Sequence, residues 1–283
     1  MLTFYQALIL GIGQGISELF PISSLGHSVL LPQILKWQID QSNDNFLIFL
    51  VATHFATAII LFLFYLKDWI LIIGGVIRSL FKRNLKDNYY GRLGWLIILG
   101  TAPAGLLGLL FQKKIQNILA VPLLVAVVLI LNGMMLWWAE IIRNRNNVRT
   151  TEGGDERLSK MRWSSSLWIG LSQSLALIPG FSRTGTTMAG GLLAGYHHED
   201  AARFSFLLAT PLILAAAILK LPALFKIADP ALLKTVTIGA VSAAIAAYFS
   251  VRFLIRFFKS KTLKPFAIYC VAAGIICLII FLI

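Results

Sequence analysis

Charged residues are scarce in this sequence. Asp, Glu, Lys and Arg make up 13% of its 283 residues, about half the share that is usual in a soluble domain. Hydrophobic residues make up 58%, and several apolar runs reach the roughly 20 residues that a helix needs to cross a bilayer. These runs lack the two-residue alternation that is typical of a membrane β-barrel. The sequence therefore excludes an ordinary soluble domain and predicts an all-α integral membrane protein.

Cysteine is also rare. Cys270 and Cys277 both lie in the last apolar run, where we expect small hydrophobic residues because no metal-ligand spacing or disulfide framework is present. The N-terminus lacks a basic segment and a small-residue cleavage site, so we expect no cleaved signal peptide. The formal net charge of +13 would suggest nucleic acid for a soluble protein. Here the cations lie between apolar runs and indicate membrane topology, with no nucleic-acid partner.

Six apolar runs are clear membrane spans, and two further regions are irregular. Gly, Pro, Ser and Thr interrupt the regions 1–31 and 164–196. We expect two broken or re-entrant helical hairpins there, because freed backbone groups are tolerated in a membrane where protein or water satisfies them. The predicted spans are 46–66, 93–111, 121–140, 203–221, 232–255 and 265–283.

Positive charge is concentrated in alternate connections between the spans. The connections 67–92, 140–163 and 252–264 hold six, six and five Lys or Arg residues, whereas the intervening connections hold two and three. Loops rich in Lys and Arg stay on the cytoplasmic side of a membrane. We therefore expect residues 1–45 to begin and end outside the cell, and residues 164–202 to begin and end inside.

Short matches indicate an internal repeat. The stretch "FLVAT" at 49–53 matches "FLLAT" at 206–210, and "PISS" at 21–24 matches "PGFS" at 179–182, with nearly the same separation. Because the charge pattern gives the copies opposite orientations, they have the form of an inverted-topology repeat, whose broken helices usually meet near the membrane midplane and build a site. The predicted organisation is a single membrane domain, 1–283, with halves 1–140 and 141–283.

Glu18 is the acidic residue that interrupts an apolar segment, whereas we expect the others in loops or at span ends. A carboxylate inside a membrane is costly unless it is paired or solvated, so a functional role is the default interpretation, and a structural glutamate is the alternative. Gln14 lies on the same helical face, and Pro21 ends that helix. The residues that follow add further polar groups: Ser23, Ser24 and His27.

The matching stretch of the second half, "PGFSRTGTTMAGG" at 179–191, has the composition of a phosphate cradle. Glycine lets backbone N–H groups approach an anion, and a following helix points its positive end at it. Arg183 adds a bidentate guanidinium. The alternative is a structural ion pair between Arg183 and Glu18. The candidate phosphate-binding residues are Ser23, Gly180, Ser182, Arg183, Thr184, Gly185, Thr186 and Thr187.

Together the two stretches predict hydrolysis of a phosphate ester or anhydride carried by a lipid. The Glu18 carboxylate is suited to Mg²⁺ or Ca²⁺, which take oxygen ligands and bridge phosphates. Arg183 and the metal would neutralise the charge that develops on the transferred phosphoryl group. We expect the remaining histidines to be structural, as for His54 within its span, or solvated, as for His197 and His198.

At these two motifs the sequence resembles the undecaprenyl-diphosphatase family, also called the bacitracin-resistance family. The family's first motif is Glu or Gln, three residues, Glu, and then Pro-x-Ser-Ser-x-Gly-His, here Gln14, Glu18 and "PISSLGH". Its second motif is Pro-Gly-x-Ser-Arg-Ser-x-x-Thr, here "PGFSRTGTT". The similarity continues at "FSFLLATP" (204–211) and "KPFAIY" (264–269), and it covers nearly the whole chain.

The resemblance implies a hydrolase of the plasma (inner) membrane that converts undecaprenyl diphosphate to undecaprenyl phosphate, recycles this carrier for peptidoglycan and cell-wall synthesis, and confers bacitracin resistance. It also implies a divalent metal, a site facing the periplasm or exterior, and a polyprenyl diphosphate lipid as partner, with a homodimer left open. By the same resemblance, Gln14 and Glu18 would organise the metal and the diphosphate. Ser182, Arg183 and Thr187 would hold phosphate. Ser24 and His27 would be the nucleophile and its acid–base partner, in either order.

Two residues depart from the pattern of this family. Gln14 in place of glutamate leaves one carboxylate for a metal, and Arg203 stands where many relatives have glutamate.

Two rival families can be compared with these motifs. A second lipid-phosphatase superfamily requires Ser-Arg-x5-His, but Ala189 occupies the histidine position here. A rival from another class is a polyprenyl-phosphate transporter or flippase, because inverted repeats with broken helices are common in transporters.

Overall fold

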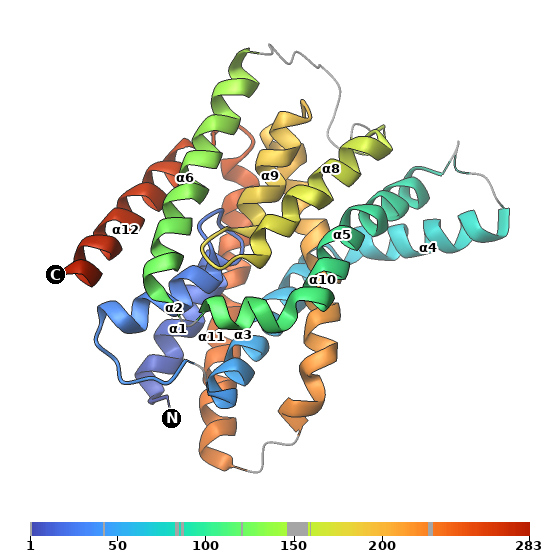
Figure 1. The fold of residues 1–283 in the computed structure, drawn as a ribbon. Helices are drawn as coiled ribbons and strands as arrows, with labels where there is room; N and C mark the ends of the chain where they lie inside the picture. The colour runs from blue at the N-terminus through green and yellow to red at the C-terminus, as the bar shows by residue number, and fades with distance from the viewer. Residues whose placement is uncertain are drawn as a thin grey trace.

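The chain is described by a computed structural model that contains helices and no strand over the residues that it covers. These are 2–41, 43–82, 85, 88–119, 121–145, 158, 160–225 and 229–283, without the side chains of 112–119, 144–145 and 220–225. Within them, six helices are long and apolar enough to cross a membrane (Figure 1), which confirms the predicted class. They are α3 (Asp44–Phe64), α5 (Tyr89–Leu119), α6 (Pro122–Arg145), α10 (His198–Phe225), α11 (Pro230–Phe257) and α12 (Lys264–Leu282).

The two irregular regions form short helices joined by turns, which confirms that both are broken. The first contains α1 (Phe4–Ser17) and α2 (Ser24–Ile34). The second contains α8 (Trp163–Gln173), a 3-10 turn η1 (Ser174–Leu177) and α9 (Arg183–Leu193).

The helices α2 and α9 correspond in length and in the way they begin. Each has 11 residues. Each follows a serine, Ser23 or Ser182, whose hydroxyl accepts a hydrogen bond of 3.1 Å from the N–H of a glycine three residues later. Such a cap satisfies one of the first N–H groups of a helix, which lack a partner within the helix. The same signal starts both helices, as expected for copies of one unit, while the exact halves 1–140 and 141–283 stay a prediction.

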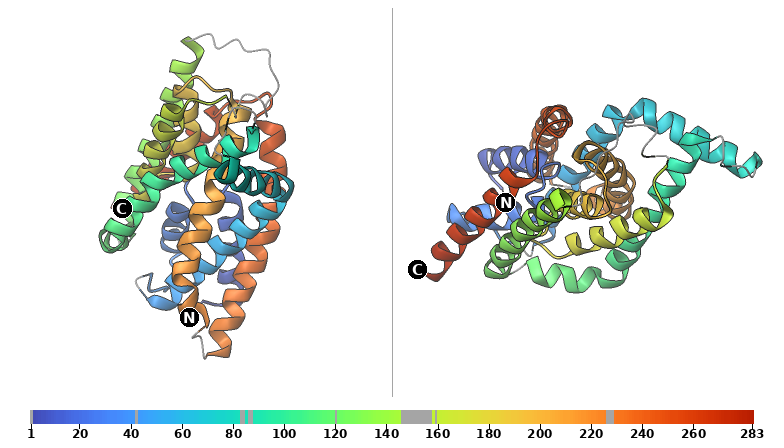
Figure 2. Two further views of the ribbon diagram at one scale, coloured as in Figure 1. Left: turned by 90° about the vertical axis from the view of Figure 1, so that its right-hand side faces the viewer. Right: turned by 90° about the horizontal axis from the view of Figure 1, so that it is seen from above.

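Helices of one predicted half pack against helices of the other. The helix α1 lies against α11, α8 lies against α5, and α6 lies against α12 (Figure 2). Glycine makes the first two contacts close. A Cβ atom added at Gly11 would lie 2.4 Å from the carbonyl oxygen of Gly239, and one added at Gly170 would lie 2.3 Å from that of Gly100. The helix backbones therefore touch, which small residues permit in membrane proteins.

The expectation of a loop at 67–92 is wrong over most of that range, because the connection contains α4 (Leu66–Lys82). Trp69 and Ile72 are buried on one face of this helix, and charged residues lie elsewhere on it, as in an amphipathic helix. The same face packs on α5, where a Cβ atom added at Gly75 would lie 2.4 Å from a backbone nitrogen. Most of the basic connection 140–163 lies outside the described residues, and the orientation of the chain across the membrane stays a prediction.

Glu140, which we expected in a loop or at the end of a span, is fully buried within α6. Its Oε1 atom accepts hydrogen bonds from His198 Nε2 at 2.5 Å and from the N–H of Leu263 at 2.6 Å. His198 is therefore buried rather than solvated, and His197 is partly buried. These contacts join α6, the start of α10 and the residue before α12, and no local sequence signal links those three places.

Candidate functional site

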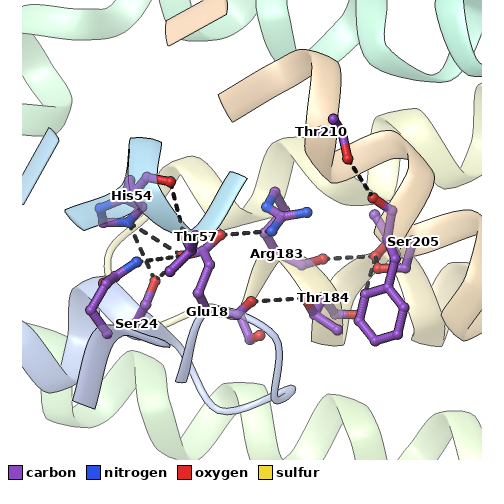
Figure 3. A network of polar contacts seen from close by, with 12 residues as sticks. Glu18, Ser24, His54, Thr57, Arg183, Thr184, Ser205 and Thr210 are labelled. Carbon is purple, nitrogen blue, oxygen red and sulfur yellow. Dashed lines mark hydrogen bonds and ion pairs between the residues drawn. The ribbon is translucent and has the colours of Figure 1, made fainter. Parts of the chain in front are cut away.

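Two turns from the predicted halves meet at Glu18, which directly follows α1. Arg183, the first residue of α9, places its Nη2 atom 2.6 Å from Glu18 Oε1. Ser24, the first residue of α2, donates its hydroxyl to Glu18 Oε2 at 2.6 Å. Both side chains point at the carboxylate (Figure 3). The structure thus brings the acid and the arginine singled out in the sequence into contact across 165 positions of the chain.

The Glu18 carboxylate is buried, with 6% of the residue exposed, and further polar groups surround it. Gln14 Nε2 donates to Glu18 Oε2 at 3.0 Å, as the four-residue helical spacing predicts. The hydroxyl of Thr184 donates to the main-chain carbonyl of Glu18 at 3.0 Å. A buried carboxylate is tolerated when it is both paired and hydrogen-bonded, and Glu18 meets both conditions.

Unusual backbone conformations shape the two turns. Ser23 has a φ angle of 71° and Gly180 has a φ angle of 106°, in a region that glycine adopts readily and other residues rarely adopt. A Cβ atom added at Gly180 would also lie 2.7 Å from the carbonyl oxygen of Val125. The turn itself therefore requires a glycine at this position, and a contact of Gly180 with phosphate stays a prediction. Strain of the kind seen at Ser23 is typical of functional sites.

Asn132, on α6, joins the two turns, and it was not among the predicted site residues. Its Oδ1 atom accepts a hydrogen bond of 3.0 Å from the N–H of Ser182, and its Nδ2 atom donates to the carbonyl of Pro21 at 3.1 Å. The Ser182 hydroxyl adds a 3.3 Å hydrogen bond to the carbonyl of Phe20. The available signal was a single amide in an apolar span, where polar residues commonly link helices.

His54, on α3, belongs to this site, although we expected it to be only structural. Its Nε2 atom lies 3.3 Å from Glu18 Oε2 and 3.5 Å from Ser24 Oγ. Its Nδ1 atom lies 2.7 Å from the carbonyl oxygen of Leu50. Since a carbonyl only accepts, Nδ1 carries a proton, and Nε2 is the ring nitrogen that faces Ser24 and Glu18.

His27 faces another way. Its Nδ1 atom lies 2.7 Å from the carbonyl oxygen of Ser23, and its Nε2 atom lies 2.7 Å from the hydroxyl of Tyr269, whose ring stacks on the imidazole. Neither hydrogen bond reaches Glu18 or Ser24. The structure therefore places His54, not His27, beside the reactive groups of the first turn.

The hydroxyls of the three candidate threonines donate to main-chain carbonyls. Thr184 donates to Glu18, Thr186 donates to Arg183, and Thr187 donates to Arg183 and lies 2.5 Å from the Ser205 hydroxyl. With Gly185 bonded to the cap, these residues hold α9 in place. The Nη1 atom of Arg183 is buried and has no hydrogen-bond partner among the described residues, so it is the group best placed for an incoming anion.

Two side chains of this site, Gln14 and Glu18, could supply oxygen ligands for a metal ion. No group of three or more His, Cys, Asp or Glu residues that could hold an ion occurs in the described part of the chain. Gln14 Oε1, however, is buried without a hydrogen-bond partner there, next to the Glu18 carboxylate. Mg²⁺ commonly takes one or two protein oxygens and completes its shell with substrate phosphate and water. Gln14 and Glu18 fit that pattern.

Comparisons with known proteins match almost the entire chain. The family model described as "Bacitracin resistance protein BacA" matches residues 7–276. A protein of Mycolicibacterium paratuberculosis named "Undecaprenyl-diphosphatase" is 41% identical over 292 residues, which cover 96% of this chain and 95% of the relative. A protein of Burkholderia thailandensis named "Undecaprenyl-diphosphatase 2" is 43% identical over 278 residues, which cover 98% and 96%.

Proposed function

Because the chain belongs to the bacitracin resistance protein BacA family, we propose that it hydrolyses undecaprenyl diphosphate to undecaprenyl phosphate and inorganic phosphate. The names of the relatives support this activity. The observation that carries it is the Arg183–Glu18 pair, built from two distant turns, with a buried guanidinium nitrogen that has no hydrogen-bond partner among the residues described. The reaction would return the lipid carrier for cell-wall synthesis, and the family's description links the chain to bacitracin resistance.

Arg183 is the residue that would bind the diphosphate. A guanidinium matches phosphate oxygens bidentately, and the first N–H groups of α9 add the positive end of a helix. Glu18 is the partner of this guanidinium in the structure. The incoming phosphate would share or replace this partner, so the arginine remains neutralised during binding.

Ser24 is the nucleophile in our proposal. Its Oγ attacks the terminal phosphorus, an Oγ–P bond forms, and the bond to the bridging oxygen breaks, which releases undecaprenyl phosphate. The Ser24 hydroxyl, whose proton is bonded to Glu18 Oε2 in the structure, turns that proton to Nε2 of His54, 3.5 Å away, where the negative charge of Glu18 stabilises the imidazolium. Water then attacks the phosphoserine. One water proton restores the Ser24 hydroxyl, the other stays on the phosphate, and His54 releases its proton to solvent.

A divalent cation, either Mg²⁺ or Ca²⁺, fits beside these groups. Gln14 Oε1 and Glu18 would hold it, and when bound it would supply positive charge against the phosphoryl oxygens. Ser24 and Arg183 are both held at the Glu18 carboxylate by direct contacts with it. We further propose a plasma-membrane location with the site facing the exterior, which the distribution of basic connections supports.

Phosphate release by the purified protein tests this function. In detergent with undecaprenyl diphosphate, the protein is expected to release one phosphate per lipid. A chelator should lower the rate by about tenfold or more, and Mg²⁺ or Ca²⁺ should restore it, because the cation neutralises phosphoryl charge. Ser24→Ala is the control for contaminating phosphatases. A protein that only transports the lipid would release no phosphate with or without metal.

Replacement of His54 tests the acid–base assignment. His54→Gln is expected to lower kcat by about 100-fold or more, because glutamine cannot take up the proton of Ser24. The KM should change little. His54→Ala should be no worse than His54→Gln, whereas a merely structural histidine would be replaced well by glutamine, which can still hydrogen-bond Glu18. His197→Gln is the matched control outside the site and should retain full activity.

A further inference from the structure

A basic pocket opens where the end of α11 lies beside the end of α3, and it encloses about 420 Å³. Three cationic residues line it: Arg252, Arg256 and Lys259. Spacings of four and three residues place them on one face, because an α-helix has 3.6 residues per turn. All three residues are exposed, so their positive charges gather at this opening of the surface.

These three cations have no carboxylate partner among the described residues. The ion pairs found there use other basic side chains: His54, Arg183, His198 and Arg203. Asp68, four residues after the end of α3, is already bonded to Arg203. The pocket therefore has a net positive charge that no described side chain balances.

The rest of the lining is mostly apolar. Phe64 comes from α3, and Tyr248 and Ile255 come from α11. Tyr248 lies one turn before Arg252, further into the span, and an aromatic ring with a hydroxyl is typical of the boundary between membrane and water. The pocket thus combines cationic and apolar walls, as an amphipathic ligand requires.

The pocket lies at the same end of two membrane spans. Phe64 is the last residue of α3, and the three cations lie in the last two turns of α11 or directly after it. The basic connections 67–92 and 252–264 continue from these ends, and we expect both on the cytoplasmic side. Phe64 follows His54 by ten residues, about 15 Å along the helix, so the pocket is separate from the Glu18 site.

We propose that this pocket binds the headgroup of an anionic phospholipid, of the phosphatidylglycerol type, from the cytoplasmic leaflet. Arg252 and Arg256 would bind the phosphodiester, since a guanidinium donates two parallel hydrogen bonds to phosphate oxygens. Basic pockets between transmembrane helices on this side of a membrane suit lipid headgroups. A free phosphate ion would leave the apolar walls uncovered, and a zwitterionic lipid would bring a further cation toward the three already there.

An alternative role for the cations is to stabilise the end of α11. Basic side chains interact favourably with the negative end of a helix, and Arg256 lies in the last turn. In that role the cations would stabilise the protein to the same extent with and without lipid. A lipid site, in contrast, makes the stability depend on the charge of the lipid headgroup.

The double variant Arg252→Gln with Arg256→Gln tests the pocket. Native mass spectrometry in a neutral detergent measures the affinity of the protein for the first bound dioleoylphosphatidylglycerol. The variant should weaken this affinity by about tenfold or more, because each basic residue near an anionic lipid contributes about fivefold. Its affinity for dioleoylphosphatidylcholine should change little. Glutamine favours helix about as well as arginine does, so the variant should fold.

Arg78 and Lys82 provide the matched control. They are also exposed and four residues apart near the end of a helix, α4, in a connection that we expect on the same side. They do not line the pocket. Arg78→Gln with Lys82→Gln removes the same charge and should leave the affinity for phosphatidylglycerol nearly unchanged. Equal weakening by the two double variants would mean a general attraction to basic surfaces, and it would overturn the proposal.

Unfolding temperatures in the same detergent separate the lipid site from a role at the helix end. Added phosphatidylglycerol should raise the unfolding temperature of the wild type and of the Arg78 and Lys82 variant more than that of the Arg252 and Arg256 variant. An equal rise in all three overturns the lipid site. So does displacement of phosphatidylglycerol by undecaprenyl phosphate at a lower concentration than by phosphatidylglycerol itself, because the pocket would then be a second carrier-lipid site. Neither measurement uses phosphate release, so a failure of the proposed hydrolysis leaves this inference standing.

Discussion

Arg183→Ala is expected to lower kcat/KM for undecaprenyl diphosphate by about 1,000-fold or more, the scale on which arginines stabilise phosphoryl transfer. Arg183 is in contact with Glu18 and begins the helix that faces the site. Without it, the charge that develops on the phosphoryl oxygens loses its main protein partner. Phosphate release at several substrate concentrations measures the loss.

Loss of structure could imitate this result, because Arg183→Ala leaves a buried carboxylate without its partner, which typically costs about 3–5 kcal/mol. The double variant Glu18→Gln with Arg183→Ala removes that charge. Its thermal unfolding temperature in detergent should recover relative to the single variant, while activity should stay lost. Recovery of both would show that Arg183 acts on stability and not on the phosphate.

Arg203 offers a matched control, since its Nη2 atom also lies 2.6 Å from a carboxylate oxygen, that of Asp68. This pair joins α10 to α4, away from Glu18. Arg203→Ala should lower the unfolding temperature and retain most of the activity. The contact gives the guanidinium of Arg203 a carboxylate partner. If both arginine variants lose activity equally, the assignment of Arg183 is contradicted.

Glu18→Gln is expected to lower kcat by about 100- to 10,000-fold, because the variant removes the charge that stabilises a protonated His54 and leaves one acceptor oxygen where the carboxylate has two, for Ser24 and Arg183. Glutamine has nearly the same shape, so the effect on folding should be smaller than that of Glu18→Ala. Steady-state phosphate release and the unfolding temperature separate the two effects.

Glu140→Gln is the control for Glu18→Gln. Glu140 is also fully buried and also bonded to a histidine, His198, but on a different set of helices. The substitution should cost stability and spare kcat. A large loss of kcat in both variants would indicate that any buried carboxylate supports activity by stabilising the fold, and would contradict a direct role for Glu18.

The sequence predicted the meeting of Glu18 and Arg183 because charge in an apolar segment is costly and the repeat places both residues in equivalent turns. Ser24 and Gln14 followed from spacing along the same chain segment. These inferences needed only local patterns and the pairing of two regions.

Other parts of the site could not be predicted in this way. His54 and Asn132 each stand alone in a long span, and their partners come from different helices. Periodicity shows which face a side chain occupies, but not which neighbour it meets. The threonines after Arg183 were similarly ambiguous, because a hydroxyl near a helix start can donate to a ligand or to the previous turn.

The interlocking of the two predicted halves has a consequence for biosynthesis. Glu18 and Arg183 are 165 residues apart, and a ribosome adds about 5–20 residues per second, so the carboxylate waits roughly 10–30 s for its partner. The helix α1 must wait longer for α11. During that interval the carboxylate has no arginine partner, so either the insertion machinery shelters its charge or the carboxyl group takes up a proton until Arg183 has been made.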